Sequence, residues 1–160
     1  VVDQAGNALA VWKETTGSQP FGYGASTTRL MWSRSLHGDA WTTPAPLIAN
    51  LAERGIVPRE GHIALVMNPN GEAVVSVKLH GLSGYSLNQS IVVGHFTFAN
   101  GWSNWSAVAN KAWMSDPQVA INASGQAVLV YTAWALDRIA GRAPTVISGE
   151  PQIKAYALSL

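Results

Sequence analysis

The sequence contains no cysteine, few charged residues and no apolar run long enough to span a membrane. The absence of cysteine excludes disulfide bonds and thiolate-bound metals. A charged fraction of 12% and a net charge of +1, without a basic run, do not suggest a nucleic-acid partner. The four histidines lack the spacing of metal ligands, so the sequence indicates neither a metal nor another cofactor.

A glycine-centred motif occurs three times in the chain. Copies aligned on Gly6, Gly71 and Gly125 share an Asp or Asn three positions before the glycine and an alanine two positions after it. The Asp or Asn side chain can accept a hydrogen bond from the backbone two residues on. Glycine supplies the positive φ that closes such a turn. Because the flanking residues alternate with a period of two, each copy predicts a β-hairpin.

The strand after each glycine is apolar on both faces. In the second copy, Ala73, Val75 and Val77 share one face and Val74 lies on the other. This pattern predicts strands that are buried on both sides, as in stacked sheets. The tryptophans at repeated strand or turn positions are expected in the core: Trp12, Trp41 and Trp102.

A second alignment extends the repeat to four strands. Residues 30–41 match residues 91–102 without a gap, and each segment ends in tryptophan. We expect an all-β fold with about three four-stranded antiparallel blades of the propeller type, covering 1–50, 59–108 and 116–160, the last one incomplete. Pro44 and Pro46 place the fourth strand of the first copy at a sheet edge. Residues 47–54 are the one segment with potential for a helical turn.

These units resemble the bacterial sialidase-like (BNR-type) β-propeller repeats over nearly the whole chain, in pattern. Residues 35–41 keep the serine, glycine and tryptophan of the family's Asp-box turn, Ser-x-Asp-x-Gly-x-Thr-Trp, but the acid is displaced. Residues 100–102 keep less of that motif. The resemblance implies a single repeat domain over 1–160 that belongs to a propeller. Since propellers typically have about four to eight blades, we expect the remaining blades from a longer chain or a homo-oligomer.

The long connections of the predicted blades all fall on one face. They are residues 14–28, 50–60, 80–90, 109–115 and 137–151. Long loops on a rigid scaffold are common binding sites, although they can also contact another domain or be tolerated insertions. Tyr23, Tyr85 and Trp113 lie in these loops and could stack on sugar rings, while Arg138 could bind a carboxylate. We predict these four as ligand-binding residues; the alternative is that the aromatics only fix the loops to the blades.

Catalytic residues cannot be assigned from the sequence. A glycosidase needs two neighbouring carboxyl groups, and no motif selects a pair among Glu60, Asp116, Asp137 and Glu150 on the long-loop face. Three functions therefore stay open. The favoured one is a non-catalytic binding or scaffolding segment with a glycan ligand. The others are a glycoside-processing enzyme of sialidase-like architecture and a purely structural protein-interaction domain.

The sequence begins with valine and shows no signal peptide. We expect that any targeting segment was removed or lies outside this sequence. Together with the resemblance, this favours a bacterial protein that is secreted or located in the cell envelope.

Overall fold

The structure is a computed structural model. It describes residues 1–16, 27–48, 56–57, 62–81, 89–103, 105–110, 113–134, 136–137, 145–146 and 151–158. Over these ranges the chain is all-β, with antiparallel strands and no helix, as the sequence predicts. The same ranges accordingly hold no helix that could serve as a membrane span.

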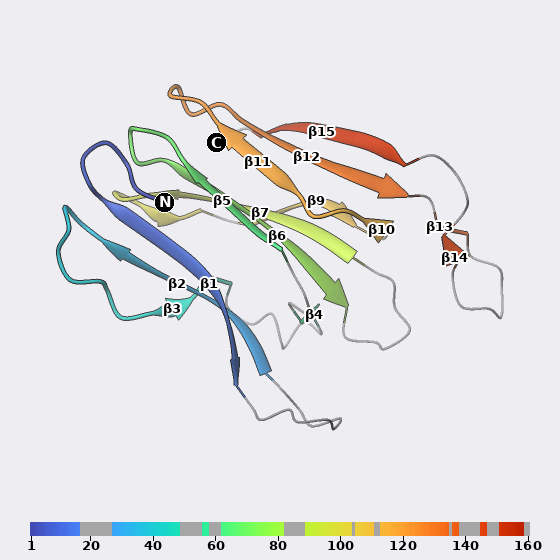
Figure 1. The fold of residues 1–160 in the computed structure, drawn as a ribbon, viewed down its shortest axis with the longest axis horizontal. Helices are drawn as coiled ribbons and strands as arrows, with labels where there is room; N and C mark the ends of the chain where they lie inside the picture. Colours follow the sequence, from blue (N-terminus) through green and yellow to red (C-terminus); the bar gives the residue numbers. More distant parts are fainter. Residues whose placement is uncertain are drawn as a thin grey trace.

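The strands form three main antiparallel sheets, one for each repeat (Figure 1). The first sheet has the order β1 (Ala8–Thr16), β2 (Thr27–Ser35), β3 (Ala45–Pro46). The central sheet contains β4 (Ile56–Val57), β5 (Ile63–Met67), β6 (Ala73–Gly81), β7 (Gln89–Thr97), β8 (Gly101–Trp102) and β9 (Ser106–Asn110). The third sheet contains β10 (Trp113–Met114), β11 (Gln118–Ile121), β12 (Ala127–Trp134) and β15 (Gln152–Leu158). A separate hairpin pairs β13 (Leu136–Asp137) with β14 (Thr145–Val146).

The central sheet is a meander with four strand positions. β4 and β5 both pair with β6, β6 pairs with β7, and β8 and β9 both pair with β7. In the first sheet, the first strand position is only an isolated bridge between Val2 and Ala8. The short β3 takes the fourth strand position, at the edge of this sheet. In the third sheet, β10 and β11 pair with one side of β12 and β15 with the other.

Backbone hydrogen bonds confirm the alignment of residues 30–41 with residues 91–102. In the first sheet, the Thr42 amide donates to the Arg34 carbonyl at 2.9 Å. In the central sheet, the Ser103 amide donates to the His95 carbonyl at 2.8 Å. The hydroxyl of Thr42 also accepts from the Arg34 amide, at 3.2 Å. The hydroxyl of Ser103 accepts from the His95 amide in the same way, at 3.4 Å. The two copies therefore share one pairing register.

The three hairpin glycines adopt the predicted left-handed backbone. Their φ values are +83° for Gly6, +82° for Gly71 and +83° for Gly125. In the second turn, Asn68 Oδ1 accepts from the amides of Asn70 and Glu72 at 3.1 and 3.0 Å. The third turn repeats this pattern around Asn122. Asn68 and Asn122 thus accept from the amide two residues on, as the motif predicts, whereas in the first turn Asp3 accepts from the amide of Asn7 at 2.8 Å.

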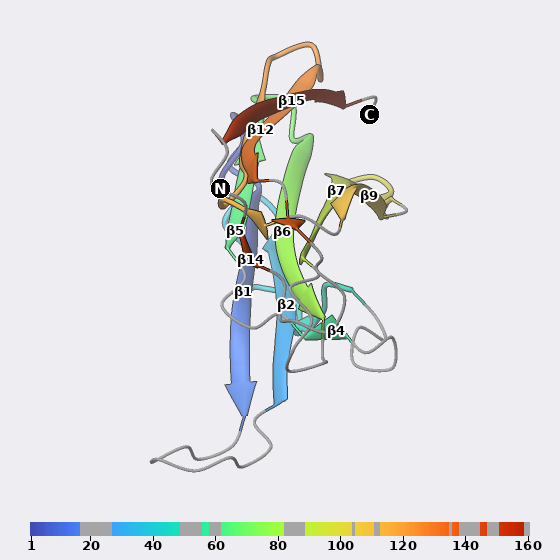
Figure 2. The same ribbon diagram turned by 90° about the vertical axis from the view of Figure 1, so that its right-hand side faces the viewer.

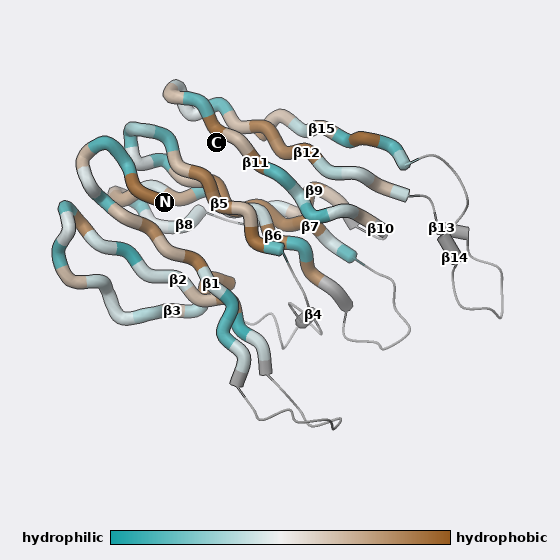
Figure 3. The backbone as a smooth tube through the Cα atoms, in the orientation of Figure 1, coloured by the Kyte–Doolittle hydropathy of each residue, from teal (hydrophilic) through white to brown (hydrophobic). Residues whose placement is uncertain are grey.

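The sheets stack face to face and enclose two cores. Between the first and central sheets, Leu30 and Leu47 pack against Val75 and Val77. Between the central and third sheets, the core comprises Val74, Ile91, Val93, Met114, Ala127, Leu129 and Tyr131. The view in Figure 2 shows the third sheet at the top and β1 and β2 of the first sheet extending downward, and Figure 3 shows the apolar segments along the central strands. The alternation predicted for the second copy is confirmed, since β6 is buried on both faces.

An aromatic cluster fills part of the core between the first and central sheets. Trp32 of β2 meets Phe96 and Trp102 of the central sheet in edge-to-face contacts, at centroid distances of 5.7 and 5.9 Å. Trp105 stacks on Trp102 at 5.7 Å. The arrangement supports the prediction that Trp102 contributes to the core.

Two predictions about burial are wrong for the outer sheets. Trp41 is 53% exposed rather than in the core. On β12, Val128 and Val130 are 41% and 37% exposed, so this strand is not buried on both sides. These residues are exposed because the first and third sheets each have a neighbouring sheet on one side only. Trp12 is partly buried.

Several predicted connections contain short strands. β4, β10 and β14 lie within the segments expected to be long loops, and β13 overlaps the last of these segments at Asp137. Each has two residues and pairs with a neighbouring strand. In the segment 47–54, residues 47–48 form a bend, and residues 49–54 lie outside the described part of the chain.

Candidate functional site

The four residues predicted to bind a ligand are placed only in part. Tyr23, Tyr85 and Arg138 lie outside the described residues. Trp113 starts β10, where its backbone pairs with Trp134 of β12, and its side chain lies outside the description. The assignment of these four residues to a binding site stays a prediction.

The strand ends from which the long connections start lie on one side of the stack. β1 ends at Thr16, β6 at Gly81 and β12 at Trp134, and the three glycine-centred turns lie at the opposite strand ends. Figure 1 shows the turns together at the upper left and these strand ends toward the lower right. We call the two sides the turn face and the long-connection face.

A polar cluster joins the central and third sheets close to the long-connection face. Lys78, near the end of β6, places Nζ at 2.6 Å from Oδ1 of Asp116, which precedes β11. The same ammonium donates to the Met114 carbonyl at 3.2 Å. His62, which precedes β5, has Nδ1 at 3.8 Å from Oδ2 of Asp116. Three residues far apart in sequence are thus brought together at the seam between two sheets.

Exposure differs across this cluster. The Lys78 side chain is 12% exposed, whereas those of His62 and Asp116 are 40% and 50% exposed. The Lys78 side chain is therefore largely covered and paired, while the side chains of His62 and Asp116 are partly open to solvent. A partly buried ion pair in this position can orient the carboxylate toward a ligand.

The segment before Asp116 is hydrogen-bonded to both the central and the third sheet. The buried Gln89 side chain accepts from the Met114 amide at 2.7 Å. Ser115 exchanges backbone and side-chain hydrogen bonds with Thr132 of β12, since its amide donates to the Thr132 carbonyl at 2.8 Å and its hydroxyl accepts from the Thr132 amide at 2.9 Å. Asp116 is thus held on a rigid support, as a binding residue requires.

Among the residues that the structure describes, the cluster offers hydrogen-bond donors and acceptors and one carboxyl group, that of Asp116. Glycoside hydrolysis needs a second carboxyl group about 5 to 9.5 Å away. Among the other predicted acids, Asp137 is placed only as part of β13, and Glu60 and Glu150 lie outside the described ranges. The described residues also contain no group of three or more His, Asp or Glu that could hold a metal ion.

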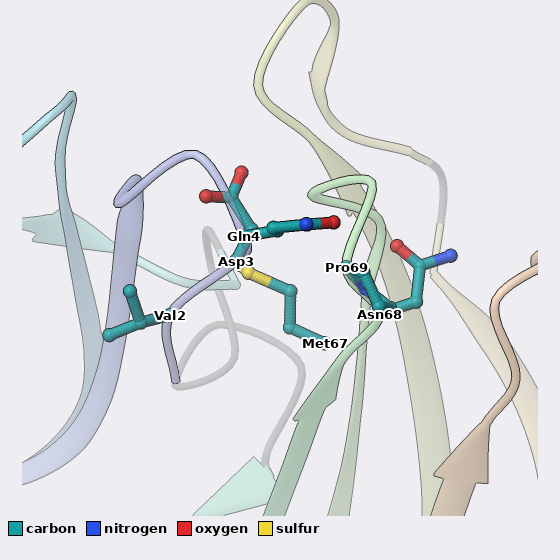
Figure 4. Close-up of a pocket in the computed structure, with 6 residues that line it drawn as sticks. All are labelled: Val2, Asp3, Gln4, Met67, Asn68 and Pro69. Carbon is teal, nitrogen blue, oxygen red and sulfur yellow. The ribbon is translucent and has the colours of Figure 1, made fainter.

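A depression lies on the turn face, between the first and second turns (Figure 4). It has a volume of about 340 Å³ and is lined by Val2, Asp3, Gln4, Met67, Asn68 and Pro69. In Figure 4, Gln4 extends toward Pro69, whereas the Asn68 amide points away from the depression.

The repeat explains why this depression lies between these two turns. Asn68 and Asn70 of the second turn donate to the carbonyls of Asn122 and Ala123 in the third, at 3.3 and 2.9 Å. The first turn has Ala5 at the position of Asn70, and an alanine cannot form the equivalent bond. We therefore interpret the depression as incomplete packing between repeats.

The sequence pattern identified one member of the cluster and missed the others. Asp116 was among the acids expected on the long-loop face. The strand pattern gives no role to Lys78, and the spacing of the histidines gives none to His62. Gln89, which supports the segment of Asp116, falls in a predicted loop. A lysine within the apolar strand Ala73–Gly81 was the available signal, because a charge in such a position needs a partner.

Comparison with known proteins gives no relative. No protein-family model, curated protein or solved structure matches this chain.

Proposed function

We propose that this chain is a non-catalytic binding or scaffolding segment of a β-propeller, that its ligand is a glycan, and that the protein is secreted or in the bacterial cell envelope. Repeated antiparallel meanders, stacked face to face with their short turns on one side, support the propeller architecture. The resemblance to sialidase-like repeats supports the location and the class of ligand.

The observation that carries the binding role is the position of the cluster of Lys78, Asp116 and His62. It lies at a seam between two sheets, near the strand ends from which the long connections start. A half-exposed carboxylate and an imidazole suit the hydroxyl groups of a sugar, which both donate and accept hydrogen bonds. Trp113 belongs to the same short segment as Asp116, and its predicted stacking on a sugar ring would complement these polar groups.

A binding role needs no second carboxyl group, and among the described residues the cluster has one. We therefore expect no turnover when the protein is incubated with a broad panel of chromogenic glycosides. Release of the chromophore from any member of the panel, abolished by Asp116→Asn, would instead support a glycoside-processing enzyme.

A glycan array tests the proposal directly. We expect the chain to bind glycans, and we expect Trp113→Ala and Asp116→Asn to weaken that binding. Loss of one stacked aromatic or one charged acceptor should cost about 1–2 kcal/mol, or roughly tenfold in affinity. Asp3→Asn on the turn face serves as the matched control and should bind as the unmodified protein does. An array without hits would leave the purely structural role, and hits unaffected by both variants would place binding elsewhere.

A further inference from the structure

The repeat defines what should cover each outer face of the stack. We call the face of the first sheet that turns away from the central sheet the head face, and the corresponding face of the third sheet the tail face. The head face carries Trp41, and the tail face carries Val128, Val130 and Ile153. Trp41, Val128 and Val130 have counterparts in the central sheet, and Ile153 lies on the same face as the two valines. The central sheet therefore shows how these positions are packed when a neighbouring sheet is present.

On the head side, the comparison is between Trp41 and Trp102. The two residues end the aligned segments 30–41 and 91–102, which share one pairing register. Trp102 packs edge-to-face against Trp32 of the preceding sheet, at a centroid distance of 5.9 Å. Trp41 is 53% exposed because no preceding sheet lies against it. The head face therefore presents the surface that, in the central sheet, receives the sheet before it.

On the tail side, the comparison is between β12 and β6. Val128 and Val130 occupy the repeat positions of Val74 and Ser76, which are fully buried by the third sheet. On the third sheet the same positions are 41% and 37% exposed. Ile153 pairs with Thr132 on the same face and is 77% exposed. The tail face therefore presents the surface that, in the central sheet, receives the sheet after it.

The space beside each turn glycine is filled by the preceding turn, except at Gly6 of the first turn. A Cβ on Gly71 would lie 2.8 Å from Oδ2 of Asp3, and a Cβ on Gly125 would lie 2.8 Å from Oε2 of Glu72. Each glycine thus makes room for an acidic side chain of the preceding turn. Gly6 has no atom within 4 Å of that position.

The third turn carries a side chain that could fill the position beside Gly6. Gln126 follows Gly125 as Glu72 follows Gly71. Its Oε1 accepts from Asn122 Nδ2 at 2.8 Å, as Glu72 Oε2 accepts from Asn68 Nδ2 at 2.6 Å. The Gln126 side chain is therefore held in the geometry that brings Glu72 against the glycine of the next turn.

We propose that the head face of one chain packs on the tail face of a second copy, in the geometry that joins consecutive sheets within the chain. One chain carries one head and one tail, so the contact is heterologous and either closes into a ring or forms an open filament. Two copies of the 160-residue chain would contribute six of the main sheets, a number within the range of about four to eight blades of propeller rings. The closure into a two-chain ring rests on the proposed propeller, whereas the head-to-tail contact rests on the repeat geometry alone.

Sedimentation velocity and light scattering on the 160-residue chain test this proposal without any glycan. We expect a dimer that dissociates on dilution. Trp41→Glu should block the head and Val130→Glu the tail, and each variant alone should be a monomer. An equimolar mixture of the two should form dimers again, because one variant retains an intact tail and the other an intact head. Asn100→Glu, in an exposed turn of the central sheet, is the control and should stay dimeric.

The outcomes separate the possible arrangements. A monomer at every concentration would overturn the proposal. Dimers of Trp41→Glu alone or of Val130→Glu alone would show that the contact is not head-to-tail. A mixture of the two variants that stays monomeric would also contradict a head-to-tail contact. Open filaments in place of dimers would retain the head-to-tail contact but reject the closed ring. Far-ultraviolet circular dichroism confirms that each variant is folded.

Engineered cysteines give a second test that does not depend on blocking a face. Asn70 Nδ2 of the second turn lies 2.9 Å from the carbonyl of Ala123 in the third. The intermolecular equivalents of these positions are Ser124 of one chain and Gln4 of its partner. Because the chain has no native cysteine, Ser124→Cys combined with Gln4→Cys should form disulfide-linked dimers on oxidation. Either substitution alone should form few, and equal yields in all three variants would contradict the proposed contact.

Discussion

Gly94 of β7 lies directly beneath the indole ring of Trp105. A Cβ on residue 94 would lie 2.8 to 2.9 Å from three atoms of the six-membered ring. The backbone of Gly94 does not have a positive φ, so an alanine there would be excluded by packing and not by conformation. We expect Gly94→Ala to lower the free energy of unfolding by about 1–3 kcal/mol through overpacking, measured by urea denaturation.

The same substitution made together with Trp105→Ala provides the control for Gly94. With the indole removed, an alanine in β7 has space, and its lower backbone entropy in the unfolded chain should make it neutral or slightly stabilising. A loss of equal size in both backgrounds would show that Trp105 is not the cause.

The glycines of the first two turns separate backbone strain from side-chain crowding. Gly6 and Gly71 have φ values of +83° and +82°, but only Gly71 has close neighbours, namely Asp3 and Phe98. We expect Gly6→Ala to cost on the order of 1 kcal/mol from the left-handed backbone alone. Gly71→Ala should cost about 2–3 kcal/mol, because the phenyl ring and the carboxylate must also move. Equal losses in urea melts of the two variants would contradict the contact between turns.

Ser76 is a buried hydroxyl without a partner. Its side chain is 0% exposed, and its Oγ forms no hydrogen bond. The other two copies have valine at this position, Val11 and Val130. Because an unpaired buried hydroxyl opposes folding, we expect Ser76→Ala to raise the free energy of unfolding by about 1 kcal/mol, measured in urea. Ser33→Ala is the matched control and should lower it, since the Ser33 hydroxyl donates to the Thr42 carbonyl at 2.7 Å.

Tyr131 should make stability depend on pH in the alkaline range. Burial, helped by the hydrogen bond and charge of Tyr156, raises the pKa of Tyr131 from 10.0 to about 12. The folded chain therefore keeps this proton at pH values where the unfolded chain loses it. The resulting stabilisation is complete below about pH 10 and is lost as the pH rises toward 12.

The variant Tyr131→Phe isolates this effect. Its free energy of unfolding should fall less than that of the unmodified chain between about pH 9 and pH 12, by a difference on the order of 2 kcal/mol. Urea denaturation at several pH values measures both slopes. Parallel slopes for the two proteins would show that the pKa of Tyr131 is the same folded and unfolded.

Features encoded by neighbouring residues could be predicted from the sequence. The turn glycines and their Asp or Asn partners act within a few residues, and the period-two alternation around Gly125 predicts the two strands that flank this turn, β11 and β12. The alternation of Val74 and Val75 between two faces follows from the pleat of a strand. These are local rules, so a single sequence is sufficient to apply them.

Features that depend on where a sheet lies in the stack could not be predicted. Trp41 and Trp102 have equivalent sequence contexts, yet one is exposed and the other packs on Trp32, because only the central sheet has two neighbours. The pairing of Lys78 with Asp116 joins different repeats and leaves no spacing pattern in the sequence. The four residues predicted to bind a ligand stay predictions.

The two faces of β6 contribute side chains to two different hydrophobic cores. Val74 packs toward the third sheet, and its neighbour Val75 packs toward the first. If β6 detaches, both cores open to water at once, and hydrophobic contacts on both sides are lost together. The repeats are therefore tied into one thermodynamic unit, although each has its own sheet, and heating should melt the chain in a single cooperative step.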